Sequence, residues 1–301
     1  MLKWVAFAVV SWILLSFIVF LVSAETAPGV SDSAKNALSS GGSLATGSTV
    51  LVLGSDQRPK HWHVQQGAKS GPSRADSILL LHVSLGSVQR LSILRDSAAE
   101  IPGHGVGRIN SSFALGGAAL AIKTVEGFLG HGLKINHVVL VSFTNFPKLI
   151  DAMGGIYVTL DNCVESNSFD GQQVKLSKGE HQLGGRQALE FSRVRENRCN
   201  PHEDDRTRAA RQQKVLSAMR SRVISPFNWP SSFIRLPLIS WQAPRALRSD
   251  MGGPGLSVLF SDLLTGGGGK TQVLGFDGVN PDGSLHVSDA DKAKAVRKLE
   301  G

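Results

Sequence analysis

Arginine and acidic side chains gather in one stretch of the sequence with a spacing that suits phosphate binding. Arg193 and Arg195 are two positions apart, so on a strand both side chains project from one face. Asp205, Arg208 and Gln212 step by three and four positions, so on a helix they line one face. Because arginine presents a planar fork of donors to phosphate oxygens, the stretch predicts a site for a diphosphate. The alternative is a solvated helix with ion pairs along it.

Further charged residues flank three apolar runs, each of which predicts a strand. Asp56 directly follows the first run, Arg74 and Asp76 directly precede the second, and Arg95 and Asp96 directly follow the third. Charged side chains at strand ends of an α/β sheet meet in a crevice, where sites of this class usually lie. Carboxylates that can hold Mg²⁺ and arginines that can hold phosphates predict phosphoryl transfer. The alternative is that both Arg–Asp combinations are ion pairs that close strand ends.

The elements that must position these residues alternate between strands and helices. Apolar runs predict strands at 50–53, 77–84, 90–94, 137–142, 156–160 and 271–276. Helical spacing predicts helices at 111–129, 143–153, 185–190, 205–223, 256–264 and 288–299. The proline-rich segment 226–244 predicts an irregular run. The alternation favours an α/β fold with helices over a central sheet.

The N-terminal segment has the pattern of a membrane helix. The run from Trp4 to Val22 is apolar and uncharged, and at about 1.5 Å per residue it spans a bilayer core of about 30 Å. Lys3 precedes the run and Glu25 is the first charge after it, which predicts a cytosolic N-terminus and an extracytoplasmic remainder. The alternative is a cleaved signal peptide with its cleavage site at 22–24, which exports the chain in the same direction.

The rest of the chain divides by composition. Residues 1–24 form the cytosolic start and the anchor, and residues 25–48, rich in Ser, Gly and Ala, predict a flexible linker. The extracytoplasmic catalytic domain is expected at 49–301, with its motifs in 49–223 and an extension at 224–301. The length of 301 residues allows one large domain or two small ones.

Charge and cysteine content bound the partners and the compartment. The net charge of +8 suits nucleic acid, phosphorylated substrates, or anionic lipid or wall polymers, and does not choose among them. The two cysteines, Cys163 and Cys199, are an even count in an exported chain, which suggests one disulfide. Export disfavours nucleic acid, because the basic domain would not meet it.

Taken together, the motifs resemble those of the LytR–CpsA–Psr family of cell-wall glycopolymer ligases. The matching segments occur in family order at 53–58, 74–78, 92–96, 108–110 with Gly116-Gly117, 151–156, 184–189, and 193–195 through 208–213. The resemblance covers about 49–223 and implies a central mixed β-sheet flanked by helices, preceded by the transmembrane helix. It also implies a pocket for a polyprenyl chain. Residues that could line it, or simply pack the core, are Phe113, Leu115, Ile122, Val125 and Phe128.

The resemblance implies an activity and assigns residues to it. Such proteins transfer a glycan phosphate from a polyprenyl diphosphate carrier to peptidoglycan, leaving a phosphodiester. Asp56 and Asp76 are then the expected Mg²⁺ ligands. The residues expected to hold the pyrophosphate are Arg74, Arg95, Arg108, Arg193, Arg195, Arg208 and Gln212, with Asp205 supporting the last group. Asp96 would either help activate the acceptor hydroxyl or orient an arginine.

The sequence departs from the family pattern at several positions. Leu94 stands where the family usually has Pro, Arg108 replaces a common Lys, and the loop 57–73 is long. The cysteine pair and the tail after Ser225 suggest an actinobacterial branch. Two other functions remain open: a non-catalytic protein that binds polyprenyl phosphate or wall polymer, and a membrane-linked transcriptional regulator.

Overall fold

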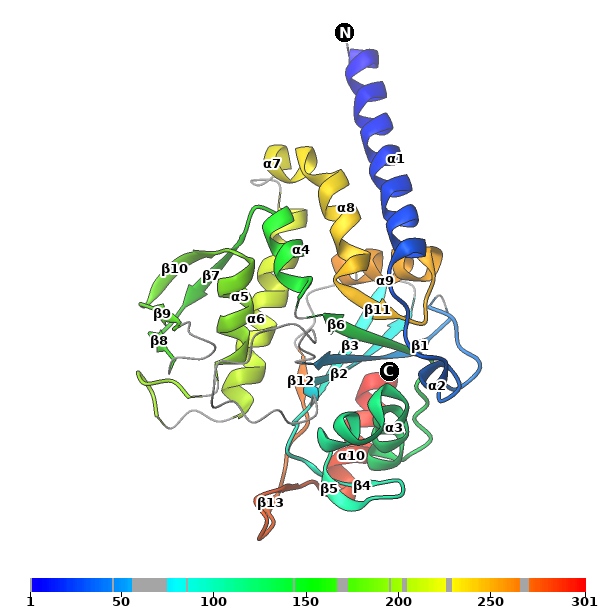
Figure 1. Ribbon diagram of the computed structural model, residues 1–301, viewed down its shortest axis with the longest axis vertical. Helices are drawn as coiled ribbons and strands as arrows, with labels where there is room; N and C mark the ends of the chain where they lie inside the picture. The colour runs from blue at the N-terminus through cyan, green and yellow to red at the C-terminus, as the bar shows by residue number, and fades with distance from the viewer. Residues whose placement is uncertain are drawn as a thin grey trace, which may run out of the picture. The chain divides into compact units, whose positions relative to one another are not determined.

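The chain folds into two compact units, each of which is described by itself. The computed structural model describes residues 2–44, 46–55, 75–84, 86–142, 144–166, 173–194, 196–201, 205–225, 229–265 and 271–301. The first unit, which we call the sheet unit, comprises Pro28–Thr144, Arg248–Met251 and Val258–Gly301. The second, which we call the helical unit, comprises Met1–Ala27, Asn145–Leu247 and Gly252–Ser257. Figure 1 labels the elements of both.

A six-stranded mixed sheet forms the centre of the sheet unit. Its strand order is β11-β6-β1-β2-β3-β12. In that order the bounds are Leu247–Ser249, His137–Ser142, Ser48–Ser55, Ala75–Ser84, Ser87–Ile93 and Gln272–Val273. β1 pairs antiparallel with β2 and parallel with β6, and β2 pairs antiparallel with β3. The predicted α/β class with a central mixed sheet is therefore confirmed.

One edge of this sheet collects the ends of several strands. Because β2 is antiparallel to β1 and β3, and β6 is parallel to β1, the N-terminal end of β2 lies at the same sheet edge as the C-terminal ends of β1, β3 and β6. Ser55, the last residue of β1, is the Cα partner of both Ala75 and Ser142. The β1–β2 register shifts at this point, which leaves Asp76 as an extra residue on β2. Such bulges are frequent beside active sites because they re-aim side chains.

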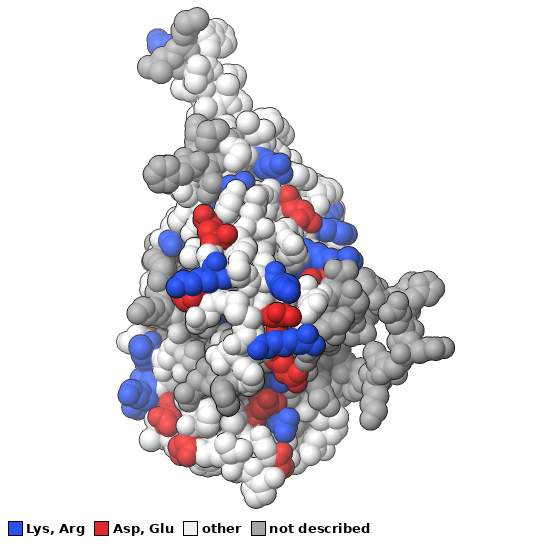
Figure 2. All heavy atoms as spheres, turned by 90° about the vertical axis from the view of Figure 1, so that its left-hand side faces the viewer, with Lys and Arg blue, Asp and Glu red and all other residues white. Residues whose placement is uncertain are grey.

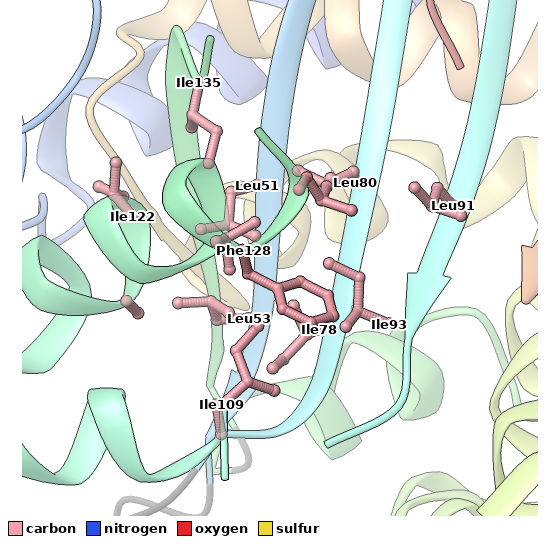
Figure 3. Close-up of a cluster of buried hydrophobic side chains, with 14 of the residues drawn as sticks. Leu51, Leu53, Ile78, Leu80, Leu91, Ile93, Ile109, Ile122, Phe128 and Ile135 are labelled. Atoms are coloured by element: carbon pink, nitrogen blue, oxygen red, sulfur yellow. The ribbon is translucent and has the colours of Figure 1, made fainter. Parts of the chain in front are cut away.

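Three helices bury apolar side chains against the sheet. They are α2 (Asp32–Lys35), α3 (Ser111–Leu129) and α10 (Asp289–Glu300). Alternate strand residues such as Leu51, Leu53 and Leu80 are fully buried in this core, as expected for one face of a pleated sheet. Figure 3 shows Ile122 and Phe128 of α3 facing these strands. The observed bounds of α3, β6 and the next strand, β7 (Ile156–Leu160), equal the predicted ones.

The expected linker differs from the structure. Residues 25–48 were predicted to be flexible, but Ala34 of α2 is fully buried and Val30 is 8% exposed in the core of the sheet unit. The backbone N–H of Ser39 donates to the carbonyl of Ile135 at 2.8 Å, and the side-chain amide of Asn136 donates to the carbonyl of Gly41 at 2.6 Å. A low apolar content was misleading here, because a few small residues suffice to dock a short helix.

The helical unit has its own smaller core. Its α4 (Phe146–Ala152), α5 (Gly185–Arg193) and α6 (Asp205–Ile224) surround a two-stranded antiparallel sheet of β7 and β10 (Gly179–Leu183). Phe191, Ile156, Ile150 and Leu183 are all fully buried in this core. The predicted helices at 143–153, 185–190 and 205–223 are therefore present, with α5 longer than expected.

The same unit contains α1 (Leu2–Thr26) and two helices in the proline-rich segment. α1 is long and apolar enough to cross a membrane and is 11% buried; α3 meets the same length and composition test but is half buried in a core. The irregular run expected at 226–244 is wrong, because α7 (Trp229–Ile234) and α8 (Leu236–Arg245) lie there. Pro230 and Pro237 occupy the first turns of these helices, where proline removes no intrahelical hydrogen bond.

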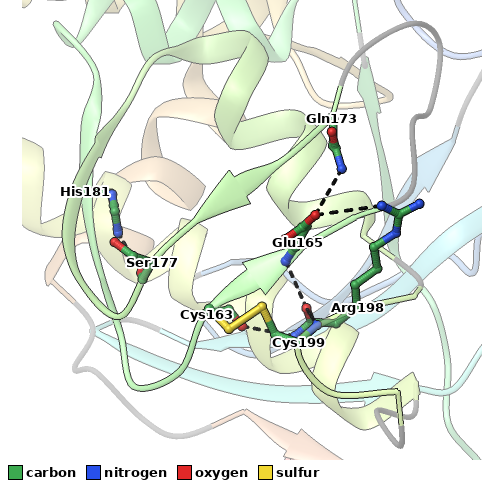
Figure 4. The surroundings of a disulfide bond; sticks show 8 residues. Cys163, Glu165, Gln173, Ser177, His181, Arg198 and Cys199 are labelled. Carbon is green, nitrogen blue, oxygen red and sulfur yellow. Dashed lines mark hydrogen bonds and ion pairs between the residues drawn. A yellow bond between two sulfur atoms is a disulfide. The ribbon is translucent and has the colours of Figure 1, made fainter.

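The predicted disulfide joins Cys163 to Cys199 in the helical unit (Figure 4). It lies beside a small sheet of β8 (Val164–Glu165) and β9 (Lys175–Leu176). Asn197, which is 2% exposed, holds the two cysteine segments together. Its Oδ1 accepts from the N–H groups of Glu165 at 2.9 Å and Cys199 at 3.1 Å, and its Nδ2 donates to the carbonyl of Cys163 at 3.2 Å.

Candidate active site

A cluster of charged side chains lies just past the C-terminal end of β3. Arg95 Nε lies 3.3 Å from Asp96 Oδ2, and Arg108 Nη1 lies 3.4 Å from Asp96 Oδ1. The side chains of Arg95 and Asp96 are 17% and 20% exposed, and that of Arg108 is 44% exposed. One carboxylate therefore bridges two guanidinium groups. The cluster keeps a net positive charge and reaches solvent mainly through Arg108, as an anion-binding site requires.

The backbone around this cluster is fixed by two hairpins. β4 (Ala98–Ile101) and β5 (Gly105–Arg108) place Arg108 opposite Ala98. The hairpin of β13 (Gly278–Val279) and β14 (Leu285–His286) docks where the N–H of Leu285 donates to the carbonyl of Asp96 at 2.8 Å. These hydrogen bonds remove the conformational freedom that the residues after β3 would otherwise have.

Asp282 adds a contact that the sequence did not indicate. Its carbonyl accepts a hydrogen bond from Arg108 Nη2 at 3.1 Å. Its carboxylate accepts from the Ser284 hydroxyl at 2.6 Å and from the Ser284 N–H at 3.0 Å. These hydrogen bonds, with a smaller contribution from the charge of Arg108, hold the pKa of Asp282 below its usual value. The contact of this turn with Arg108 was not predicted.

Of the two predicted metal ligands, only Asp76 belongs to the described residues. Asp76 is the bulged residue of β2, and its side chain is not described; Asp56 and the phosphate-binding candidate Arg74 lie outside the described residues. Among the described residues, no group of three or more His, Cys, Asp and Glu side chains could hold a metal. Ser55 and Ala75, the chain neighbours of the two aspartates, are nevertheless Cα partners in the β1–β2 pairing. Carboxylate oxygens are the donors that Mg²⁺ prefers.

Arg193 lies on a helix, so the predicted strand at 193–195 is wrong. It is the last residue of α5, with Val194 as the C-cap, and Arg195 lies outside the described residues. Ala188 and Phe191, three positions apart, are both fully buried, so the apolar period of this segment is helical. The alternation of Arg193 and Arg195 resembled a strand only because the helix ends between them.

The predicted helix at 205–223 is present as α6 and carries the remaining candidates. Arg208 is buried at 6% exposure and Gln212 is half-buried, while Asp205 begins the helix with its side chain outside the description. Arg211, which was not predicted as a site residue, is 5% exposed and donates from Nη2 to the carbonyl of Val194 at 2.8 Å. A cation at the C-terminal end of α5 offsets the partial negative charge there. Arg211 therefore positions the end of α5, where Arg193 lies.

Of the residues suggested for a lipid pocket, most belong to the core. Phe113, Ile122, Val125 and Phe128 are 0–6% exposed and pack in the sheet-unit core, whereas Leu115 is 50% exposed. Two glycines after Leu115 explain the difference, because Gly116 and Gly117 have non-helical backbone angles and interrupt α3. Core packing, one of the two roles left open by the sequence, is therefore found for four of the five residues and not for Leu115.

Acidic side chains lie among basic ones on the face that Figure 2 displays. The net charge of +8 is therefore not gathered into one continuous basic stripe on that face. The arrangement suits local anion sites, such as the Arg95–Asp96–Arg108 cluster, more than a long polyanion groove.

The comparisons with known proteins identify the family. The LytR_cpsA_psr family profile matches residues 22–263, so this chain belongs to that family. The Regulatory protein MsrR of Staphylococcus aureus (strain COL) is 32% identical over 181 residues, covering 59% of this chain and 49% of MsrR. The polyisoprenyl-teichoic acid–peptidoglycan teichoic acid transferase TagT of Bacillus subtilis (strain 168) is 33% identical over 174 residues, covering 57% of this chain and 51% of TagT. The chain thus spans about half the length of these curated relatives.

A solved structure has the same fold. The LytR-Csp2A-Psr enzyme from Actinomyces oris superposes with a TM-score of 0.66 at 20% identity, covering 91% of this chain and 97% of that one. The expected family and its mixed α/β fold are both confirmed.

Proposed function

We propose that this protein transfers a glycopolymer phosphate from a polyprenyl diphosphate carrier to peptidoglycan. The observation that carries the proposal is the cluster of Arg95, Asp96 and Arg108 at the sheet edge to which Asp76 also belongs. Two guanidinium groups on one carboxylate form a positive, partly exposed site that suits a diphosphate. The transferase name of TagT, a family relative, supports the same reaction class.

In the proposed reaction, arginines bind and neutralise the diphosphate while Asp96 holds two of them in place. A peptidoglycan hydroxyl attacks the phosphorus that carries the glycan. The bond from this phosphorus to the bridging oxygen breaks, that oxygen leaves with the polyprenyl monophosphate, and the hydroxyl proton passes to solvent. Positioning and charge neutralisation supply most of the catalysis in phosphoryl transfer. Arg193, Arg195 and Arg208, with Gln212 and its supporting residue Asp205, are proposed to bind the same diphosphate.

We propose Asp56 and Asp76 as the residues that hold Mg²⁺, with Arg74 between them in the chain as a phosphate ligand. A divalent cation would supply charge neutralisation on the phosphate oxygens. The β1–β2 pairing of Ser55 with Ala75, the chain neighbours of these two aspartates, supports the proposal.

The proposed location is the cell membrane, with α1 as a single-pass anchor and the remainder extracytoplasmic. The length and composition of α1 support the anchor, and the disulfide supports an oxidising compartment. A periplasm- or surface-active reporter fused to the C-terminus should be active. Activity only of a cytosolic reporter would overturn this topology and favour a membrane-linked transcriptional regulator. The name of MsrR, a regulatory protein, also suggests that function.

The direct test uses the full chain in detergent micelles with a polyprenyl diphosphate glycan, a peptidoglycan oligomer and Mg²⁺. Mass spectrometry should detect a phosphodiester-linked product. The product should be lost in Arg95→Ala and retained in Arg198→Ala, because the Arg198 side chain lies by the disulfide at 58% exposure. Lipid that stays bound and intact would instead favour a non-catalytic binding protein.

A further inference from the structure

The C-terminal half of α1 presents most of its large apolar side chains outward. Its buried residues are three small ones, Ser16, Ser23 and Ala24, at 2%, 0% and 9% exposure, and one large one, Phe20, at 8%. The exposed residues of the same stretch are Phe17, Ile18 and Val22, at 48%, 57% and 50%. A helix packed in water buries its large apolar residues, whereas helices packed in lipid meet through small residues and expose the large ones. The outer surface of this stretch therefore suits hydrocarbon.

Within the helical unit, α8 runs beside this stretch of α1 (Figure 1). α7 directly precedes α8, and we call residues 229–245 the α7–α8 segment. Trp12 Nε1 donates to the carbonyl of Phe233 at 2.8 Å, and Ser23 Oγ donates to the carbonyl of Trp241 at 2.6 Å. Polar bonds between helices are typical of packing in membranes. At about 1.5 Å per residue, Trp12 and Ser23 are about 16 Å apart along α1, roughly half of a bilayer core.

The α7–α8 segment also exposes large apolar side chains. Ile234, Leu238 and Trp241 are 69%, 48% and 37% exposed. Between residues 229 and 244 the sequence has one charged residue, Arg235, whose guanidinium lies beside Gly154 of the same unit. A water-facing helix pair of this length would normally carry several charges on its outer side.

Arg245 marks the level at which this apolar surface ends. Its guanidinium lies 3.5 Å from the centre of the Trp241 ring and donates to Ser23 Oγ at 2.5 Å and to Thr26 Oγ1 at 2.8 Å. A tryptophan and an arginine together at the end of an apolar segment are typical of the membrane–water interface.

We propose that the α7–α8 segment inserts into the outer half of the bilayer beside α1, as a second membrane contact that does not span. Its occupant is lipid acyl chain, in contact with Ile234, Leu238 and Trp241. The inference rests on the proposed anchor role of α1 and extends it, because the anchor then becomes a small helical assembly with a fixed orientation.

The test places a polarity-sensitive fluorophore on single introduced cysteines of the full chain. The two native cysteines are bonded to each other and do not compete for the label. The reporters are Leu238→Cys and Ile234→Cys, and the matched control is Leu216→Cys, a 49% exposed leucine on α6 of the same unit. Ile18→Cys reports on α1 separately.

In phosphatidylcholine–phosphatidylglycerol vesicles, labels at 238 and 234 should show blue-shifted emission that is quenched by acyl-chain doxyl lipid. The label at 216 should keep aqueous emission and resist this quencher. If the label at position 18 is quenched and the labels at 238 and 234 are not, the proposed insertion of the α7–α8 segment is overturned and the anchor role of α1 stands. Loss of quenching at all three overturns both, and a blue shift without lipid quenching assigns the surface to a protein partner and also overturns the proposal.

Discussion

The Asp96 carboxylate contacts the guanidinium of its sequence neighbour, with Arg95 Nε 3.3 Å from Asp96 Oδ2. Neighbouring residues on a regular strand project to opposite faces, so this contact depends on the turn that follows β3. The second oxygen of Asp96 faces Arg108, so both carboxylate oxygens have cationic partners. The geometry favours an orienting role for Asp96 over proton abstraction, because both of its carboxylate oxygens already contact guanidinium groups.

Replacing Asp96 with Asn should therefore lower transfer activity without removing it. Losing the charged partner of two arginines should cost about 10- to 100-fold, since a hydrogen bond to a charged group is worth about 1.5–3 kcal/mol. Arg95→Ala should cost about 10²–10³-fold, as for removal of a donor to developing negative charge. Initial rates measured across pH check the assignment. Complete loss in Asp96→Asn, with loss of the acidic limb of the wild-type profile, would make Asp96 the general base.

The break in α3 predicts opposite effects for two glycines of one helix. Gly117 has φ of 62° and ψ of −156°, so Gly117→Ala should destabilise the protein by about 1–3 kcal/mol through backbone strain. Gly127 lies within the regular part of α3 with nothing within 4 Å of an added Cβ. Gly127→Ala should stabilise by about 0.5–1 kcal/mol through helix propensity. Urea denaturation measures both, and equal effects would contradict the local origin of the break.

The pKa of Asp282 predicts an acid-sensitive turn beside Arg108. Hydrogen bonds from Ser284 lower the pKa of Asp282 in the folded protein. The stabilisation is therefore fully present above the unfolded pKa of about 3.9 and is lost as the pH falls through the lower folded value. Hydrogen exchange of the Ser284 amide should accelerate over that range. Ser284→Ala removes the main cause and should return the Asp282 pKa toward its ordinary value; an unchanged pKa would contradict this cause.

Removing the disulfide should destabilise the helical unit. The bond closes a loop with a sequence separation of 36, for which chain entropy predicts about 3–4 kcal/mol. The double variant Cys163→Ser, Cys199→Ser should lose about this much in urea denaturation. Lys214→Ala is a control of small effect, because its bond to Asp161 is an exposed ion pair and such pairs contribute little to stability. Equal losses in the two variants would contradict the predicted contribution of the bond.

The buried α2 predicts that residues 28–44 are part of the folded protein. Ala34→Asp should place an unpaired charge in the core and destabilise by about 3–5 kcal/mol. Lys35→Ala, at a neighbouring position whose side chain is 51% exposed, should change stability by less than about 0.5 kcal/mol. Thermal unfolding of both variants checks the difference. A tolerated Ala34→Asp would restore the linker interpretation.

Sequence reasoning was most successful where one face of an element is buried. The bounds of α3, β6 and β7 were predicted correctly because apolar periodicity is a direct consequence of packing. It was wrong at Arg193, where a helix ends between two arginines, and at 226–244, where prolines occupy positions that helices tolerate. It was also wrong for α2, whose burial depends on contacts with distant segments.

The candidate site was predictable in part for a similar reason. The position of Arg95 and Asp96 after an apolar strand was visible in the sequence and is confirmed at the end of β3. The contact from Arg108 to Asp282 was not, because the two are 174 positions apart and the acceptor is a backbone carbonyl without a sequence signature. The role of Arg211 was missed because its partner is also a carbonyl, that of Val194.

The Cys163–Cys199 bond determines how the chain responds to cleavage. The bond closes a covalent ring that contains all of α5, including Arg193, and excludes α6. One cut by a protease inside the ring leaves both fragments joined, so the mass on a gel falls only after a reductant is added. One cut outside the ring separates the fragments at once. An exported protein nicked inside this ring would therefore keep Arg193 attached and release nothing into the medium.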